Sequence, residues 1–202
     1  DTRPRKYLDE VGNSTSAEFD DRGRISKYIY AELDEERFEY DARNNVTKVT
    51  RVPKAGSGQA NLVIQAAWNT NWNKPDWIKD AKGQQTDFVY YNSGNGASRL
   101  WTATRPPPVG VTPRPVYSFA YNNRGQVLNE TDPTSLVTSN TFDAANGNLL
   151  TTTVNPSGLA LTTSFGYEAQ GDVISTSDPR GNLVEWTYDA NRRKTIARQH
   201  NG

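Results

Sequence analysis

The sequence contains no cysteine and no methionine, and its single histidine is His200. Without cysteine, the chain cannot form disulfides, thiolate metal sites or a cysteine nucleophile. One histidine leaves almost no material for a histidine-rich metal site or a histidine-dependent catalytic triad. We therefore predict no metal, no cofactor and no catalytic residue, so the chain is not expected to be an enzyme.

An excess of charge of either sign is also missing, because 23 lysines and arginines balance 23 aspartates and glutamates. No net field attracts the chain to nucleic acid or to an anionic membrane. No run approaches the roughly 18 apolar residues that a membrane-spanning helix requires. Methionine is missing at position 1 too, which indicates a segment of a longer protein.

The residues that are present favour β-structure. Only 34% of the chain is hydrophobic, yet 10% is aromatic, which is unusual for a disordered chain. Threonine and aromatic residues favour strands, whereas asparagine, glycine and proline favour the turns between strands. The composition therefore predicts an all-β protein with a thin core and many turns.

An aromatic residue followed by an acid or an amide recurs along the chain, often at a spacing of 21 residues (19 to 40, 121 to 142, 167 to 188). A glycine or asparagine commonly follows three residues after the acid, as at Gly23, Gly125 and Gly171. Repeats of this length are typical of arrays built from one supersecondary unit. The pairs are Phe19-Asp20, Tyr40-Asp41, Trp68-Asn69, Tyr121-Asn122, Phe142-Asp143, Tyr167-Glu168 and Tyr188-Asp189.

A second element alternates with the first. Its members have turn chemistry, since Asp or Asn accepts backbone hydrogen bonds, Pro presets φ, and Gly adopts positive φ. An aromatic residue stands ten positions after each leading residue. The members are Asp80 to Gly83, Asp132-Pro133, Asn155-Pro156 and Asp178-Pro179 with Gly181, and the aromatic residues are Tyr90, Phe142, Phe165 and Tyr188.

The two elements together define a hairpin. Trp186 and Tyr188 stand two apart, so alternation along a strand places both on one face. Each 21-residue unit is then two strands and two tight turns, and one hairpin alone is marginal in water. The predicted fold is a long antiparallel sheet of consecutive β-hairpins, a solenoid-like arc in which each unit contacts its neighbours.

The repeat covers residues 19–202, whereas residues 1–18 form a lead-in that lacks it. Residues 53–65 predict a loop insertion. Residues 105–115 are proline-rich and predict an extended excursion that is a possible domain boundary, because proline cannot join an interior strand. The charged residues 31–37 interrupt the pattern and could form a helical turn.

This pattern resembles the RHS or YD-repeat family. The resemblance rests on Tyr40-Asp41, on residues 19–25, and on Asp178 to Gly181 running into Tyr188-Asp189. It covers about nine-tenths of the chain, and residues 53–115 match least well. The resemblance implies a β-ribbon that forms the wall of a hollow shell in bacterial secreted toxin-type proteins.

The same resemblance implies a structural role and a secreted or cell-surface location. It also implies a partner, which is either the rest of the parent protein or an enclosed toxin domain. The core that closes such shells and the toxin domain are both missing here. Asp178-Pro179 is an ordinary repeat turn and does not correspond to the self-cleaving aspartate site of that core.

Other functions remain as alternatives. The repeated acids could be glycosidase carboxylates, but their recurrence in every unit favours turn capping. Trp72, Trp77 and Trp101, together with Trp68, could stack on sugars in a carbohydrate-binding or adhesion module, although filling a thin core explains them as well. Open sheet edges could also pair identical chains in a self-assembling scaffold.

Overall fold

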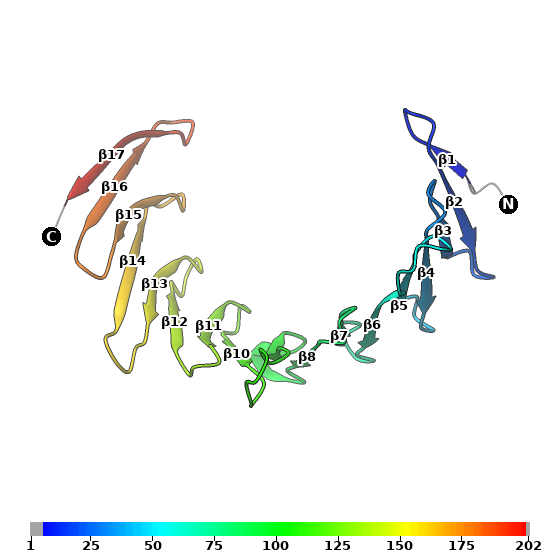
Figure 1. Ribbon diagram of the computed structural model, residues 1–202. Coiled ribbons are helices and arrows are strands. Elements are labelled where there is room, and N and C mark those ends of the chain that lie inside the picture. The colour runs from blue at the N-terminus through cyan, green and yellow to red at the C-terminus, as the bar shows by residue number, and fades with distance from the viewer. Residues whose placement is uncertain (1–5, 201–202) are drawn as a thin grey trace. The chain divides into compact units, whose positions relative to one another are not determined.

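The computed structural model describes residues 6–200, which form seventeen β-strands and one short 3₁₀ helix, η1 (Gly94–Gly96). All strand pairs are antiparallel, and most consecutive strands are joined by tight turns, with longer connections between β5 and β6 and between β9 and β10 (Figure 1). The predicted all-β class, built from successive hairpins, is confirmed. The chain divides into two compact units, residues 1–88 with 105–112 and residues 89–104 with 113–202.

The first unit is a sheet in which each strand pairs with the next one along the chain. One-residue register shifts, or β-bulges, occur where β2, β4 and β6 end. Its strands are β1 (Lys6–Leu8), β2 (Ser14–Phe19), β3 (Ile25–Ile29), β4 (Glu35–Tyr40), β5 (Val46–Val52), β6 (Leu62–Trp68), β7 (Pro75–Lys79) and β8 (Gln85–Tyr90), whose last two residues fall in the second unit.

The second unit repeats this arrangement, again with bulges where every second strand ends. Its strands are β9 (Leu100–Thr104), β10 (Val116–Tyr121), β11 (Val127–Thr131), β12 (Val137–Phe142), β13 (Leu149–Val154), β14 (Leu161–Tyr167), β15 (Val173–Ser177), β16 (Leu183–Tyr188) and β17 (Lys194–His200).

The irregular segments differ in part from the sequence predictions. Residues 105–115 lie between β9 and β10, but the predicted insertion at 53–65 ends earlier, because β6 begins at Leu62. Residues 31–37 are not helical: they form a tight turn and then the start of β4. The lead-in has repeat-like structure, since β1 and β2 are joined by a turn at Asp9; its residues 1–5 lie outside the described part.

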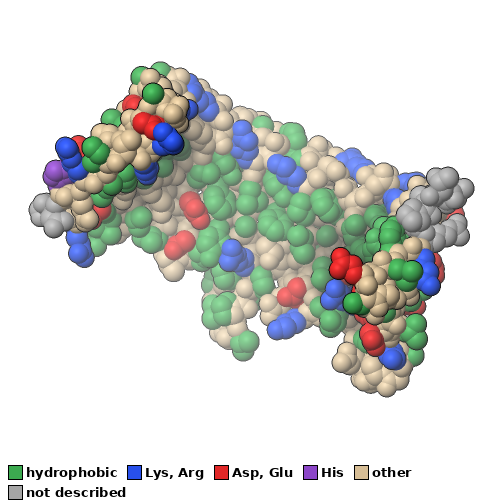
Figure 2. Space-filling view, turned by 90° about the horizontal axis from the view of Figure 1, so that it is seen from above, with side chains coloured by type: hydrophobic (Ala, Val, Ile, Leu, Met, Phe, Trp, Pro, Cys, Tyr) green, Lys and Arg blue, Asp and Glu red, His purple; other side chains and the backbone are tan. Residues whose placement is uncertain are grey.

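Each unit is a single layer of sheet. Among the described residues, Ala17 is the only buried hydrophobic residue, and hydrophobic side chains such as Leu62 and Trp101 are about half exposed. Figure 2 shows hydrophobic side chains at the open surface. Stability must therefore come from contacts between neighbouring strands, the unit of sheet stabilisation.

The two faces of each sheet differ. Paired residues share a face, so the register places Phe38 and Tyr40 on one side of β4 and Glu39 on the other. The same alternation places Trp186 and Tyr188 opposite Glu185 in β16. We call these the aromatic face, which carries Phe38 and Tyr40 or Trp186 and Tyr188, and the polar face, which carries Glu39 or Glu185.

Candidate functional site

The repeated acid-containing turns are the most regular feature of the structure. In the turn at Asp20, the Asp20 amide donates to the Arg24 carbonyl and the Gly23 amide donates to the Asp20 carbonyl, at 2.8 Å each. Gly23 has a φ of 77°, a conformation that costs glycine little. This is a three-residue hairpin connection ending in a left-handed residue, a common form in antiparallel sheets.

The leading side chain closes most of these turns. Asp20 Oδ1 accepts hydrogen bonds from the amides of Arg22 and Arg24, at 3.0 and 2.9 Å. Six other turns repeat these contacts to the second and fourth residues after the leader, which is Asp9, Asp41, Asp80, Asp132, Asp178 or Asp189. Asn122 does the same without a charge. The acids therefore occupy turn positions spread along both units.

These hydrogen bonds explain the acidity of the carboxyl groups. The Arg24 side chain holds the pKa of Asp20 below its usual range, and the side-chain amides of Asn45 and Asn182 do the same for Asp41 and Asp178. A carboxylate held in its charged form by local donors acts as a cap. General acid catalysis instead requires a raised pKa.

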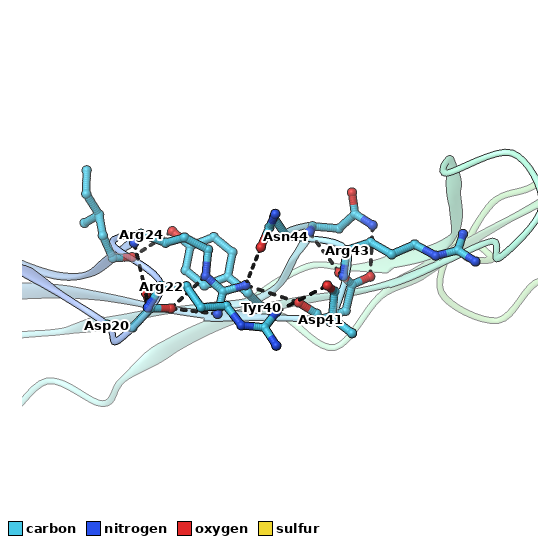
Figure 3. Close-up of polar contacts among 10 residues, drawn as sticks. Asp20, Arg22, Arg24, Tyr40, Asp41, Arg43 and Asn44 are labelled. Atoms are coloured by element: carbon cyan, nitrogen blue, oxygen red, sulfur yellow. Dashed lines mark hydrogen bonds and ion pairs between the residues drawn. The ribbon is translucent and has the colours of Figure 1, made fainter.

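Side chains of one turn also bind the next turn of the same type (Figure 3). Arg24 donates to the Asp41 carbonyl at 3.2 Å and to Asn44 Oδ1 at 3.0 Å, while its guanidinium lies 4.4 Å from the centre of the Tyr40 ring. Arg22 donates to the Ala42 carbonyl. Arg43 in turn donates to the Thr70 carbonyl in the following turn. We call this row of contacts the turn ladder.

The second unit has its own turn ladder. Arg124 donates to the carbonyls of Ala144 and Ala145, and Gln126 donates to the Gly147 carbonyl at 2.7 Å. Near the C-terminal end, Arg192 binds both carboxylate oxygens of Asp172 at 2.7 Å. Two-point pairing of this kind fixes the orientation of the guanidinium.

Gly125 shows how closely the ladder packs. A Cβ atom at Gly125 would stand 1.7 Å from Arg99 Nη2, so a larger residue would displace the end of the Arg99 side chain, and the φ of 79° favours glycine as well. The Arg99 guanidinium also lies 5.8 Å from the centre of the Tyr121 ring.

The repeated aromatic residues reach across to the preceding strand. Tyr40, at the end of β4, donates its hydroxyl to the carbonyl of Ile25, the first residue of β3, at 2.7 Å. Tyr188 makes the same contact with Val173 at 2.7 Å, and Tyr121 with Leu100 at 2.9 Å. At the equivalent position in β6, Trp68 uses its indole N–H in place of a tyrosine hydroxyl and donates to the Val46 carbonyl at 2.9 Å. Each ring thus covers a bulge or strand end and satisfies a carbonyl there.

Two predicted positions depart from this pattern. Asn155 was predicted to lead a turn like that of Asp178, but it has a φ of 54° itself, and its carbonyl accepts from both Gly158 and Ala160. Beyond Tyr90, the last residue of β8, the turn position is taken by Tyr91. Its hydroxyl donates to the Phe119 carbonyl at 2.8 Å.

The tryptophans considered for sugar stacking are spread over both units. Trp72 follows Asn69 in the turn after β6, and its indole nitrogen is buried without a hydrogen-bond partner among the described residues. Trp77 lies in β7 opposite Ala67 and Asp87. Trp101 belongs to the second unit, where its ring packs 5.8 Å from that of Tyr91.

Sequence reasoning missed the turn ladder and the hydroxyl contacts of the rings. A signal for the ladder was present, because Arg22, Arg43 and Arg124 each stand two residues after the leading Asp or Asn. The hydroxyl contacts left only a weak signal. Tyr recurs at the strand ends, but Phe19 and Phe142 at equivalent positions lack the donor.

Within residues 6–200, no group of three or more His, Asp or Glu side chains could hold a metal ion. None of the helical structure in the same range could cross a membrane.

Comparison with known proteins yields a likeness of fold. No protein-family model and no curated protein sequence matches the chain. The fold is similar to that of several solved structures. One is TcdB2-TccC3 without its hypervariable C-terminal region, which matches with a TM-score of 0.70 at 14% identity over 92% of this chain and 10% of that one. TcdB2-TccC3-Cdc42 gives a TM-score of 0.66 at 13% identity over 96% of this chain and 12% of that one.

A third similar structure is the Photorhabdus luminescens Tc holotoxin pore with a TccC3 mutation (TM-score 0.51, 13% identity, 94% of this chain and 14% of that one). The chain therefore spans only 10 to 14% of the length of these toxin chains. At this level of identity the likeness defines a class of fold, the all-β hairpin array found within Tc toxin chains.

Proposed function

We propose that the chain is a non-catalytic structural segment, part of the wall of a larger secreted YD-repeat protein of toxin type. Its partners are then the remaining parts of that protein, including an enclosed domain. The observation that carries this proposal is the repetition of one turn along both units, with arginine contacts from turn to turn. The fold likeness to Tc toxin chains supports it.

A single-layer sheet suits a wall because it presents two different faces. The polar face carries charged or hydroxyl side chains, and the aromatic face carries the rings. Acids in this arrangement serve turns and ion pairs, which supports a protein without an active site.

Thiol labelling tests the wall hypothesis directly, because the chain has no cysteine of its own. Thr152→Cys and Thr153→Cys place single thiols on opposite faces of β13. In the isolated chain both thiols should react with a bulky maleimide at similar rates. In the complete parent protein one face should react at least tenfold more slowly. Equal rates in the parent protein would contradict the proposal.

Two alternatives rest on specific features. Half-exposed Trp101 beside Tyr91 keeps a carbohydrate-binding or adhesion module open. Binding on a glycan array that is lost in folded Trp72→Ala, Trp77→Ala or Trp101→Ala variants would favour that module. Self-association is open because β1 pairs only with β2 in its unit and β17 only with β16 in its own. A strictly monomeric chain in concentrated solution, measured by light scattering, would contradict it.

A further inference from the structure

Four consecutive strands of the second unit carry no charged residue. Strands β12, β13, β14 and β15 contain no Asp, Glu, Lys or Arg, although 23% of the whole chain is charged. Exposed sheet surfaces normally carry charged side chains, which keep them soluble and unpaired. The lack of charge in these exposed strands is therefore unusual, and it suits a surface that contacts a neutral partner.

The polar face of this block, extended by the adjoining strand β11, is a grid of hydroxyl and amide groups. Strand pairing places ten such residues on one face, and the same register adds only Val137 and Gly166. We call this grid the hydroxyl face. It consists of Asn129, Thr131, Ser139, Thr141, Thr151, Thr153, Thr162, Ser164, Ser175 and Ser177.

Cross-strand hydrogen bonds hold the grid in order. Thr141 and Thr151 hydroxyls lie 2.6 Å apart, and those of Thr153 and Thr162 lie 2.9 Å apart. Each hydroxyl provides one donor and two acceptor lone pairs, so a pair that shares one proton retains a donor and several acceptors. These remaining groups face outward, beside the threonine methyl groups.

A groove borders the hydroxyl face at its C-terminal side. It has a volume of about 470 Å³, and its lining includes Ser175 and Thr187 from the polar face, with Glu185 and Arg198 beside them. Glu185 and Arg198 stand opposite each other in β16 and β17, and with Glu168, which also lines the groove, they offer hydrogen-bond acceptors and donors. Vicinal hydroxyls of a sugar ring can satisfy such groups without bringing a charge of their own.

We propose that the hydroxyl face binds a neutral, β-linked polysaccharide, with the groove at Glu185 and Arg198 holding one of its sugar units. A β-linked chain is an extended ribbon with hydroxyls along its edges and C–H groups on its faces. The grid offers matching partners at about 4.8 Å between strands and about 6.8 Å along them. An anionic polymer would meet no compensating charge on the hydroxyl face itself, and in the groove it would meet the carboxylates of Glu168 and Glu185 beside Arg198.

This site is separate from the tryptophans considered for sugar stacking, because none of those residues belongs to the hydroxyl face. It does not depend on the wall hypothesis either, since one open face of a wall remains free to bind. Failure of one proposal therefore leaves the other standing.

Sedimentation with insoluble polymers tests the proposal. The probes are microcrystalline cellulose and α-chitin, with polygalacturonate gel as the anionic control. Thr153→Lys adds a charge to the hydroxyl face. Thr152→Lys adds the same charge to the opposite face of β13, and it breaks a similar hydroxyl contact, that of Thr152 with Asn140 at 2.8 Å. Circular dichroism verifies the fold of both variants.

The wild-type chain and Thr152→Lys should bind cellulose or chitin, and Thr153→Lys should bind at least tenfold more weakly. Binding should persist at 1 M NaCl. If Thr153→Lys does not fold, Thr153→Val takes its place, with a loss of at least twofold expected. Absence of wild-type binding to both neutral polymers, or equal losses in the two lysine variants, would overturn the proposal.

Discussion

Strands β2 to β5 and strands β11 to β15 use the same aromatic pattern but stabilise their polar faces in different ways. In β2 to β5 the polar face is a row of ion pairs. Lys27 contacts Glu18 at 2.7 Å and Glu35 at 4.0 Å, and Lys48 contacts Glu39 at 2.7 Å. In β11 to β15 the corresponding contacts join neutral groups, such as Ser139 with Asn129 at 2.7 Å.

The comparison shows which features of the repeat are constant and which ones vary. The turns and the rings recur in both regions, so they define the fold. Neighbouring strands need complementary partners on the polar face, and opposite charges or hydroxyl pairs both serve. The two regions should therefore respond alike to loss of a ring and differently to salt.

Removal of a repeated ring should have the largest effect, and it should be equal in the two regions. Tyr40→Ala and Tyr188→Ala each lose a half-buried ring and a hydroxyl contact, so we expect losses of about 2 to 4 kcal/mol in unfolding free energy. The matched Tyr→Phe variants keep the ring and should lose about 1 kcal/mol. Urea denaturation measures all four variants. A large loss at one site only would show that the rings do not play a shared role.

Acid should destabilise both regions, because most leading aspartates have lowered pKa values when folded. Such groups contribute stability that is fully present above their unfolded value, close to 3.8, and is lost as the pH falls through their folded values. We therefore expect stability to decline below about pH 4.

Asp178→Asn is the matched control, since Asn122 already closes a turn with an amide. This variant should retain most of its stability at neutral pH and lose part of its acid dependence, as measured by thermal unfolding between pH 2.5 and 7. Glu168 is an exception among the leaders, because burial and hydrogen bonding with Asp172 raise its pKa. An unchanged acid profile in Asp178→Asn would count against turn capping by the carboxylate.

Salt should distinguish the two regions. Lys27→Gln should lower stability by about 0.5 to 1 kcal/mol at low salt, and by less at 1 M NaCl, because exposed ion pairs are screened. Hydrogen exchange read out by mass spectrometry assigns the change to individual strands. Protection of β2 to β5 should fall with salt relative to that of β11 to β15. Equal responses of the two regions would contradict the contrast.

The smallest effect is expected in the hydroxyl rows. Thr153→Val keeps the branched side chain and removes one hydroxyl contact, so we expect a loss of at most about 0.5 kcal/mol, independent of salt. Denaturation at low and high salt tests this expectation. The two regions would not differ if Thr153→Val lost as much unfolding free energy as Lys27→Gln does at low salt. The same holds if salt reduced the loss in Thr153→Val.

The sequence was sufficient to predict the class, the turns at acids and the sharing of faces by aromatic pairs. It was insufficient where other residues adopt the turn. The turn after β3 places Leu33 at a φ of 67°, and Tyr30 leads it. Neither residue signals a turn, so the sequence leaves a helical turn open for the charged segment. Pairing of β4 with β3 and β5 outweighs local preference there.

The contacts between turns were also beyond the sequence prediction. Arg124 and Ala144 are 20 residues apart, and only the paired strands bring their turns together. The exposure of the sheet was similarly unexpected. The composition predicts a thin core. In the structure Ala17 is the only buried hydrophobic residue of the described part, because each unit is one layer of sheet with nothing packed on it.

The central claim is that consecutive hairpins form a single-layer sheet whose strands recur about every ten residues. Hydrogen exchange of the wild-type chain, measured residue by residue by NMR, tests it most directly. We predict that the amides of every strand from β2 to β16 exchange slowly and to a similar extent, and that the amides of each turn exchange rapidly. No single segment should be protected much more strongly than the others. Protection concentrated in one compact segment, with the remaining strands exchanging freely, would contradict the account.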